Sequence, residues 1–178
     1  MVSDLHWWLD TLSSPSIVCQ LQPCGPLQDL GLYVDALTSW GIGIVIGDKW
    51  ASFQLSPSWK IYGQDICWLE MIAIELLAYF LEEKGLWDAY LLIHSDNPGT
   101  IGTLGKGRSP NTHINLSVHC IHLVLVDLFI TPNFTYIESG ANPADPILCR
   151  ELGPASRHIF PTFVLPEELI DCFVDVKS

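Results

Sequence analysis

Apolar residues in the first third of the chain occur in three short runs, each bounded by glycine or by polar residues. Runs of this length and composition predict β-strands at 30–36, 41–46 and 50–55. Gly47 and Asp48 separate the last two runs and are typical of a tight hairpin turn. The sequence therefore predicts an antiparallel meander of three strands.

The middle of the chain has longer apolar runs, which are typical of buried helices. Residues 65–84, which end at Gly85, predict a helix that is apolar almost all round and therefore packed against a sheet. A fourth strand is expected at 89–95. It ends at Asp96, where Asn-Pro-Gly stops the strand and can begin a helix. A second long apolar helix is expected at 111–130.

The remaining pattern predicts a fifth strand at 134–138 and a short helix that contains Asp145. After Gly153 the chain is rich in proline and is expected to be extended, with a helical turn at 166–173. Three antiparallel strands followed by crossovers predict an α/β fold, with a mixed five-stranded sheet flanked by helices. This is the element order of the ribonuclease H fold.

The domain boundaries follow from the same pattern. A chain of 178 residues is long enough for one domain with a sizeable core, which we place at 30–152. Residues 1–29 are expected to form a short amphipathic helix, capped by Ser3, and an irregular linker. Residues 153–178 are a C-terminal extension.

Composition limits the possible partners. The chain is 49% apolar and only 16% charged, and it has seven Trp residues, so part of its apolar surface is expected to contact another protein or domain. A net charge of −12 argues against binding nucleic acid by bulk electrostatics. Any contact with a polyanion then requires a local basic patch or bound metal ions.

The sequence also predicts an intracellular protein, cytoplasmic or nuclear, that does not enter a membrane. The two longest apolar runs are interrupted, one by Glu70 and Glu75 and the other by His122 and Asp127. Neither reaches the roughly 20 residues that span a bilayer. No basic region precedes the first apolar residues, so no secretory signal is expected. The six cysteines have no zinc-type spacing and are expected to be free thiols.

Four carboxylates occupy notable positions. Asp35 lies inside the first strand, Glu70 in the buried helix, Asp96 at the end of the fourth strand and Asp145 in the first turn of the last helix. The end of a central strand is where open α/β sheets place their chemistry. Each acid alone is also compatible with a turn or a helix cap. Gathered without basic partners they would repel one another, unless divalent cations neutralise them. Two Mg²⁺ or Mn²⁺ ions about 4 Å apart would suit hydrolysis of a phosphodiester.

The second acidic ligand has two candidates on the same helix. Glu70 and Glu75 are five residues apart and therefore point about 140° apart, so only one can face the site. Glu70 shares its stripe with Ile74 and other apolar residues, whereas Glu75 aligns with Tyr79 and Glu82 on what we expect to be the outer stripe. We favour Glu70, and Glu75 stays open.

Five segments of the chain carry a family resemblance and occur in the family's order: 34–43, 65–73, 95–102, 105–111 and 138–145. Together they resemble the ribonuclease H-like domain of fungal retroelement polyproteins, of the kind found beside tyrosine-recombinase (DIRS-like) reverse transcriptases. The resemblance covers roughly residues 30–152. It implies a metal-dependent nuclease that cuts the RNA strand of an RNA–DNA hybrid. The family's catalytic and metal-binding acids would be Asp35, Glu70, Asp96 and Asp145.

The sequence departs from that family in two ways. Many ribonucleases H have a mobile histidine before the last Asp, whereas residues 139–144 contain none and His158 lies beyond the motif. The polymerase that normally precedes the domain is absent, so the chain is either a fragment or a free-standing descendant.

Four further residues are candidates for contact with a nucleic acid. Lys106 and Arg108 form the one close basic pair, in a glycine-containing loop that follows the Asp96 helix and suits phosphate binding. Their alternative is an ordinary surface turn. Asn97 and Asn111 could contact the 2′-hydroxyl that distinguishes RNA from DNA.

Three functions are compatible with these patterns. The first is the ribonuclease H-like nuclease, with a reverse transcriptase domain or another protein over its apolar surface. The second is a binding or scaffold module that retains the fold without turnover. A weaker third is a DNA-cutting nuclease or transposase relative.

Overall fold

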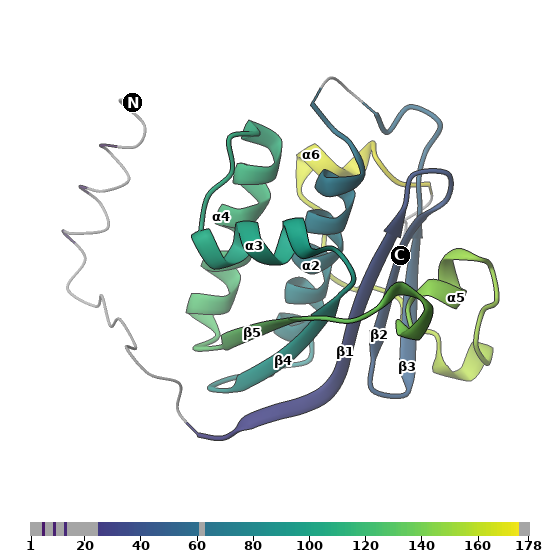
Figure 1. The fold of residues 1–178 in the computed structure, drawn as a ribbon, viewed down its shortest axis with the longest axis horizontal. Coiled ribbons are helices and arrows are strands. Elements are labelled where there is room, and N and C mark those ends of the chain that lie inside the picture. The colour runs from purple at the N-terminus through teal and green to yellow at the C-terminus, as the bar shows by residue number, and fades with distance from the viewer. Residues whose placement is uncertain (1–4, 6–8, 10–12, 14–24, 61–62, 175–178) are drawn as a thin grey trace.

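The computed structural model describes residues 25–60 and 63–174, together with the single positions 5, 9 and 13. Five strands form one sheet in the order β3-β2-β1-β4-β5 (Figure 1). The strands are β1 (Leu27–Leu37), β2 (Gly41–Ile46), β3 (Lys49–Gln54), β4 (Tyr90–Ser95) and β5 (Thr131–Tyr136). The first three are antiparallel, whereas β4 is parallel to β1 and β5 is parallel to β4. The expected mixed five-stranded sheet, three antiparallel strands followed by parallel crossovers, is confirmed.

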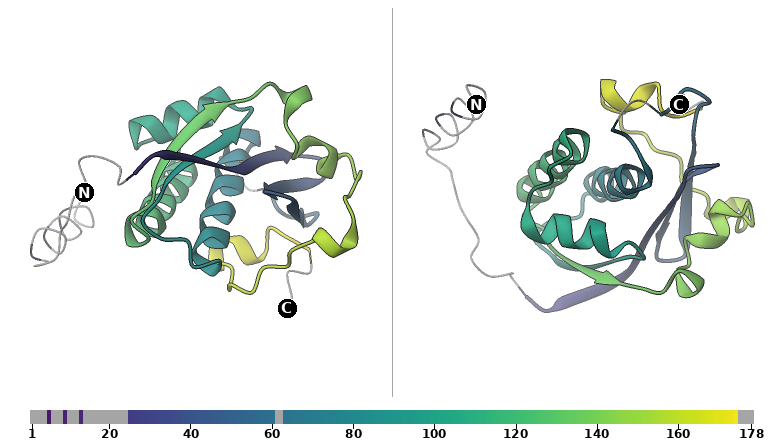
Figure 2. Two further views of the ribbon diagram at one scale, coloured as in Figure 1. Left: turned by 90° about the horizontal axis from the view of Figure 1, so that it is seen from below. Right: turned by 45° about the horizontal axis from the view of Figure 1, so that its top comes forward.

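Helices lie on both sides of this sheet (Figure 2). The helices are α2 (Ile66–Glu83), α3 (Pro98–Lys106), α4 (Thr112–Asp127), α5 (Asp145–Leu148) and α6 (Glu167–Ile170). Two 3₁₀ turns, η1 (Ser139–Ala141) and η2 (Ala155–Arg157), complete the set. The long helix α2 packs on the sheet through a large apolar core and is covered in turn by α4, whereas α5 lies on the opposite face. Asp65 begins α2, because its carboxylate accepts the N–H of Trp68 at 3.1 Å.

Two strands differ in extent from the prediction. β5 begins at Thr131 rather than at 134, and it includes Pro132. β5 is an edge strand, where the missing N–H of a proline costs no ladder bond. β1 begins at Leu27 rather than at 30, and its pairing with β4 is irregular between Gln28 and Leu32.

Residues 153–174 pack onto the rest of the fold. Four of their apolar side chains belong to the central core: Leu165, Leu169, Cys172 and Phe173. Two backbone N–H groups of this segment bond to the β3 region, Ile159 to the carbonyl of Trp50 and Val174 to that of Gln54, both at 2.8 Å. The helical turn expected at 166–173 is present as α6.

The predicted N-terminal helix and linker lie largely outside the described residues. Of these positions, Leu5, Leu9 and Ser13 are helical and exposed. Among the described cysteines, Cys67, Cys120, Cys149 and Cys172 are free thiols, as expected. A search of the described residues finds no helix with the length and apolar character that a membrane crossing requires.

Candidate metal centre

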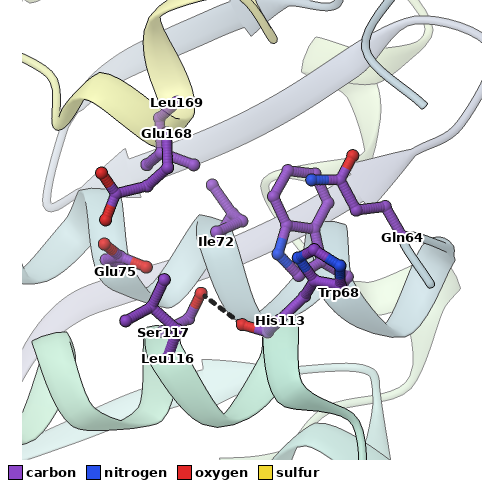
Figure 3. A pocket seen from close by; sticks show the side chains of 9 residues that line it. All are labelled: Gln64, Trp68, Ile72, Glu75, His113, Leu116, Ser117, Glu168 and Leu169. Carbon is purple, nitrogen blue, oxygen red and sulfur yellow. Dashed lines mark hydrogen bonds between the residues drawn. The ribbon is translucent and has the colours of Figure 1, made fainter. Parts of the chain in front are cut away.

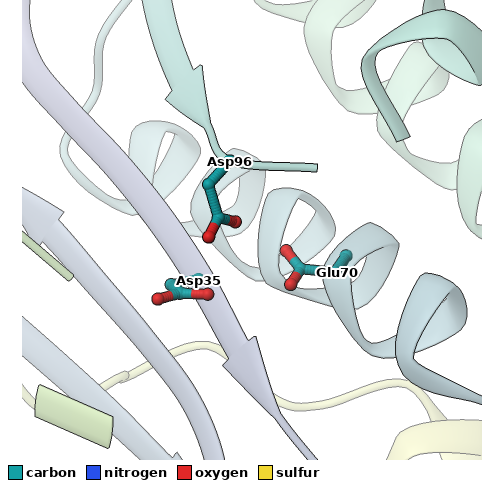
Figure 4. A group of neighbouring side chains, drawn as sticks. All are labelled: Asp35, Glu70 and Asp96. Atoms are coloured by element: carbon teal, nitrogen blue, oxygen red, sulfur yellow. The ribbon is translucent and has the colours of Figure 1, made fainter. Parts of the chain in front are cut away.

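Three of the predicted acids meet at one end of the sheet. Asp35 comes from β1, Asp96 directly follows β4, and Glu70 reaches them from α2 (Figure 4). One carboxylate oxygen of each lies within 4.8 Å of the others. The sheet register explains the meeting of the two aspartates, because Val34 and Ser95, the residues just before them, are paired neighbours in parallel strands.

Burial makes this cluster unfavourable for bare negative charge. Asp35 and Glu70 are each only 4% exposed, and Asp96 is half-buried. Burial, together with the charges of the neighbouring Asp35 and Asp96, raises the pKa of Glu70 to about 9. Burial also raises the pKa of Asp35 to about 7, assisted by Asp96. The N–H of Ala36, which donates to Asp35 at 2.8 Å, opposes that rise.

No basic side chain among the described residues neutralises the negative charge of this cluster. Within the described ranges, no Lys, Arg or His forms an ion pair with any of the three acids. The Oε2 atom of Glu70 is buried without a hydrogen-bond partner. A buried carboxylate oxygen of this kind is costly unless something neutralises it. The donor set is composed only of carboxylate oxygens, which fits a hard divalent cation such as Mg²⁺ or Mn²⁺.

Glu75 lies elsewhere, in a pocket between α2, α4 and α6 (Figure 3). Its carboxylate accepts the hydroxyl hydrogen of Tyr79 at 2.8 Å, and burial raises its pKa. The expectation that Glu75 lies on an outer stripe was wrong. The side chain is 2% exposed, because α4 and α6 cover this side of α2. Of the two candidates, only Glu70 is placed beside Asp35 and Asp96.

Asp145 is close to this cluster but is not part of it. It is half-buried at the first position of α5, and its charge contributes to the raised pKa of Asp35. Asn142, which is 3% exposed, connects the two acids. Its amide nitrogen donates to the carbonyl of Val34 at 3.0 Å, and its amide oxygen accepts the N–H of Ala144 at 3.1 Å. These bonds end one residue from each acid, so Asn142 sets the spacing between Asp35 and Asp145.

A second contact also holds α5 in place. Gly43 of β2 is the register partner of Asp35, so the two positions share a face of the sheet. A Cβ atom at Gly43 would lie 2.9 Å from the carbonyl oxygen of Ala144. Glycine is therefore required here for α5 to approach. The roles of Asn142 and Gly43 were not predicted, because neither residue has a local sequence pattern that indicates its distant partner.

The two asparagines predicted to contact sugar have structural roles. Asn97 caps α3, where its side chain accepts the N–H of Thr100 at 3.1 Å. Asn111 caps α4 through its oxygen, while its amide nitrogen donates to the carbonyl of Gly63 at 2.7 Å. Both polar atoms of Asn111 are engaged, so capping accounts for this residue without a substrate.

The predicted basic pair is exposed. Lys106 is the last residue of α3 rather than a loop residue, and Gly107 ends that helix in the left-handed conformation with φ 66°. Arg108 follows immediately. The helix that carries Lys106 begins two residues after Asp96, so one element connects the acidic cluster to the basic pair.

No protein-family model matches this chain, and a search of curated proteins finds no match. Among solved structures, the chain is similar to RNase H1 from the halophilic archaeon Halobacterium salinarum NRC-1. The identity is 12% and the TM-score 0.49, and the match covers 68% of this chain and 94% of that one. It is also similar to the foamy viral protease–reverse transcriptase in complex with an RNA/DNA hybrid. Here the identity is 14% and the TM-score 0.46, with 84% of this chain and 26% of that chain covered. The chain thus spans about a quarter of the viral protein.

Proposed function

We propose that this chain is a divalent-metal-dependent nuclease that hydrolyses the RNA strand of RNA–DNA hybrids, and that it derives from a retroelement. The observation that carries the proposal is the buried cluster of Asp35, Glu70 and Asp96, in which Oε2 of Glu70 has no partner. The five ordered segments that resemble the retroelement domain support the substrate and the origin.

In this proposal Asp35, Glu70, Asp96 and Asp145 hold two Mg²⁺ or Mn²⁺ ions. When bound there, such ions would supply Lewis acidity that favours deprotonation of water and stabilises developing negative charge. The protein fixes the positions of these carboxylates and sets their protonation states. Since the pKa values of Asp35 and Glu70 are raised to about 7 and about 9, without a cation Glu70 is largely protonated near neutral pH and Asp35 is divided between its two forms. They release protons when a cation binds.

The substrate is held beside these acids. Lys106 and Arg108 contact phosphates of the hybrid, because they are exposed at the end of the helix that begins next to Asp96. Asn97, which directly follows Asp96, contacts a sugar hydroxyl of the hybrid in this proposal. A reverse transcriptase domain, or another protein, covers exposed apolar surface of this chain and provides further contacts to the nucleic acid.

Cleavage of a labelled RNA–DNA hybrid in Mg²⁺ or Mn²⁺, beside duplex DNA and duplex RNA, tests the proposal. We expect metal-dependent cutting of the RNA strand of the hybrid, and its loss in Asp96→Asn, with circular dichroism confirming that this variant is folded. Absence of cutting by the folded wild-type chain in both metals would reject the nuclease. Cutting of duplex DNA alone would favour the DNA-cutting relative.

The second candidate is a binding module with this fold and no turnover. It is favoured by the lack of His in 139–144 and by the position of His158, which stacks on Trp50 of the edge strand β3 at 4.0 Å between ring centroids. A binding module would retain an RNA–DNA hybrid in a gel-shift assay without cutting it, and Asp96→Asn would bind it equally well.

A further inference from the structure

A small pocket between α2, α4 and α6 contains a buried carboxylate that the proposed metal centre does not use. Glu75, which is 2% exposed, lines this pocket from α2, on a different side of the helix from Glu70 (Figure 3). Its Oε1 atom accepts the hydroxyl hydrogen of Tyr79 at 2.8 Å. We call this cavity the Glu75 pocket. Its volume of about 30 Å³ is that of one or two water molecules, so a ligand can place only a compact group inside it.

The Glu75 pocket carries negative charge without a basic partner. Glu168 of α6 is exposed at its rim, and Figure 3 shows its carboxylate facing that of Glu75. Burial raises the pKa of Glu75 despite the hydrogen bond from Tyr79, and the charge of Glu168 adds to this rise. Among the described residues that line the pocket there is no Lys or Arg. A cation between the two carboxylates would therefore be stabilised by both.

The polar groups of the pocket match a primary ammonium ion. Ser117, which is buried, adds a hydroxyl near the carboxylate of Glu75. This hydroxyl donates to the carbonyl of His113 at 3.5 Å, so its oxygen can still accept a hydrogen bond. Two carboxylates and one hydroxyl then offer one acceptor group to each N–H of a primary ammonium. A Mg²⁺ or Ca²⁺ ion would need about six oxygen ligands, and the pocket has no room for the waters that would complete such a shell.

The remaining walls are aromatic and aliphatic. Trp68 lines the pocket, and its ring stacks on that of Trp59 with 6.3 Å between centroids. The Nζ atom of Lys60 lies 6.0 Å from the centre of the Trp59 ring, so this pair of indoles already holds one cation. Ile72 and Leu169 also line the pocket, and their apolar surface suits the methylene groups that follow an ammonium.

We propose that the Glu75 pocket binds the ammonium group of a primary alkylamine, with Glu75, Glu168 and Ser117 accepting its N–H hydrogens. The carbon chain leaves between Leu116 and Glu168, the lining residues that are exposed. The ammonium belongs to a free amine or to a lysine side chain of another protein, and the test below separates these sources. The pocket contains none of the four acids assigned to metal binding, so the proposal is independent of the nuclease assignment.

Calorimetric titration of the full-length chain with n-butylamine at neutral pH, where this amine is protonated, tests the binding. We expect saturable binding at a single site. n-Butanol has the same chain without the charge, and tetramethylammonium has the charge without N–H donors, so both should bind at least about tenfold more weakly. No saturable binding of butylamine, or equal binding of either control compound, would overturn the proposal. Nα-acetyl-lysine amide separates the sources, because an affinity at least equal to that of butylamine indicates a lysine side chain and a lower one a free amine.

Chemical shifts then locate the amine on the chain. When butylamine is added to protein with labelled Ile and Leu methyl groups, we expect the largest changes at Ile72, Leu116 and Leu169. Leu123 lies on α4 like Leu116 but does not line the pocket, so its methyl groups should change little. Largest changes elsewhere in the chain would place the amine at another site and overturn the proposal.

Matched variants complete the test. Glu168→Gln removes a carboxylate at an exposed position, so the fold should be retained, and it should weaken butylamine binding at least about tenfold. Glu75→Gln should have the same effect, and its amide oxygen can still accept the hydrogen bond from Tyr79. Glu167→Gln makes the same change at a neighbouring exposed residue that does not line the pocket, and it should leave the affinity unchanged. Equal affinities of the Glu168→Gln and Glu167→Gln variants would contradict the assignment.

Discussion

Replacement of Glu70 by Gln should change how the stability of the metal-free protein depends on pH. The pKa of Glu70 is raised from its usual 4.5 to about 9, and the side chain is only 4% exposed. Between these two pH values the unfolded chain releases the proton while the folded chain keeps it. The free energy of unfolding therefore falls as pH rises, by about 1.4 kcal/mol for each pH unit. The contribution of Glu70 is complete below pH 4.5. About 3 kcal/mol of it is lost by pH 7, and about 6 kcal/mol by pH 9.

Urea unfolding followed by circular dichroism, in EDTA at several pH values from 5 to 9, measures this slope. Glu70→Gln carries no titrating group at this position, so its stability should fall less steeply than that of the wild type, by up to about 1.4 kcal/mol per pH unit. Addition of Mg²⁺ at pH 8 should stabilise the wild type, by about 2.7 kcal/mol at one hundred times its dissociation constant. The variant should gain much less, because it has lost a ligand.

Glu82→Gln is the matched control, because it makes the same change at an exposed position of the same helix. Its slope with pH should be that of the wild type. Parallel slopes for Glu70→Gln and the wild type would show that Glu70 is not held protonated by burial. Equal stabilisation of both proteins by Mg²⁺ would show that Glu70 is not a ligand.

Four further substitutions test the support of the site and the packing of the C-terminal segment. Gly43→Ala should destabilise the fold by about 1–3 kcal/mol in urea, because the new Cβ would lie 2.9 Å from the carbonyl of Ala144. Gly102→Ala, in open space on α3, should instead stabilise it by about 0.5–1 kcal/mol, and the opposite order would contradict the close approach of α5. Asn142→Ala should weaken Mn²⁺ binding in a titration and cost about 2 kcal/mol of stability, whereas unchanged affinity would exclude Asn142 as a positioning residue. Phe173→Ala should cost about 3–5 kcal/mol, since this side chain is 6% exposed in the core, and a loss below 1 kcal/mol would show that the C-terminal segment is loosely held.

Much of this fold could be predicted because the decisive signals are local. The helix expected at 65–84 is α2 at Ile66–Glu83, since its apolar composition and its capping Asp65 act within a few residues. The fourth strand and Asp96 were located by the Asn-Pro-Gly that follows them. Asp35 and Asp96 lie side by side because each follows a residue of the same register pair, Val34 and Ser95, on neighbouring parallel strands.

The missed features depend on distant parts of the chain. The fifth strand was expected to begin at 134, whereas β5 begins at Thr131 and includes Pro132, which only a position at the edge of the sheet accommodates. The burial of Glu75 depends on α6, about ninety residues further along the chain. The amide of Asn142 bonds to a carbonyl 108 residues away, and no local pattern predicts a contact of that separation.

Both outer edges of the sheet are protected against pairing with another chain. Ile159 and Val174 donate backbone hydrogen bonds at the two ends of β3, and Pro132 interrupts the row of N–H donors on β5. Open strand edges are the usual starting points of β-aggregation, and this chain is 49% apolar. The C-terminal segment therefore shields the edge of β3 from intermolecular pairing, in addition to contributing side chains to the core. A chain shortened before Ile159 would expose the edge of β3 and is expected to form intermolecular sheets on storage.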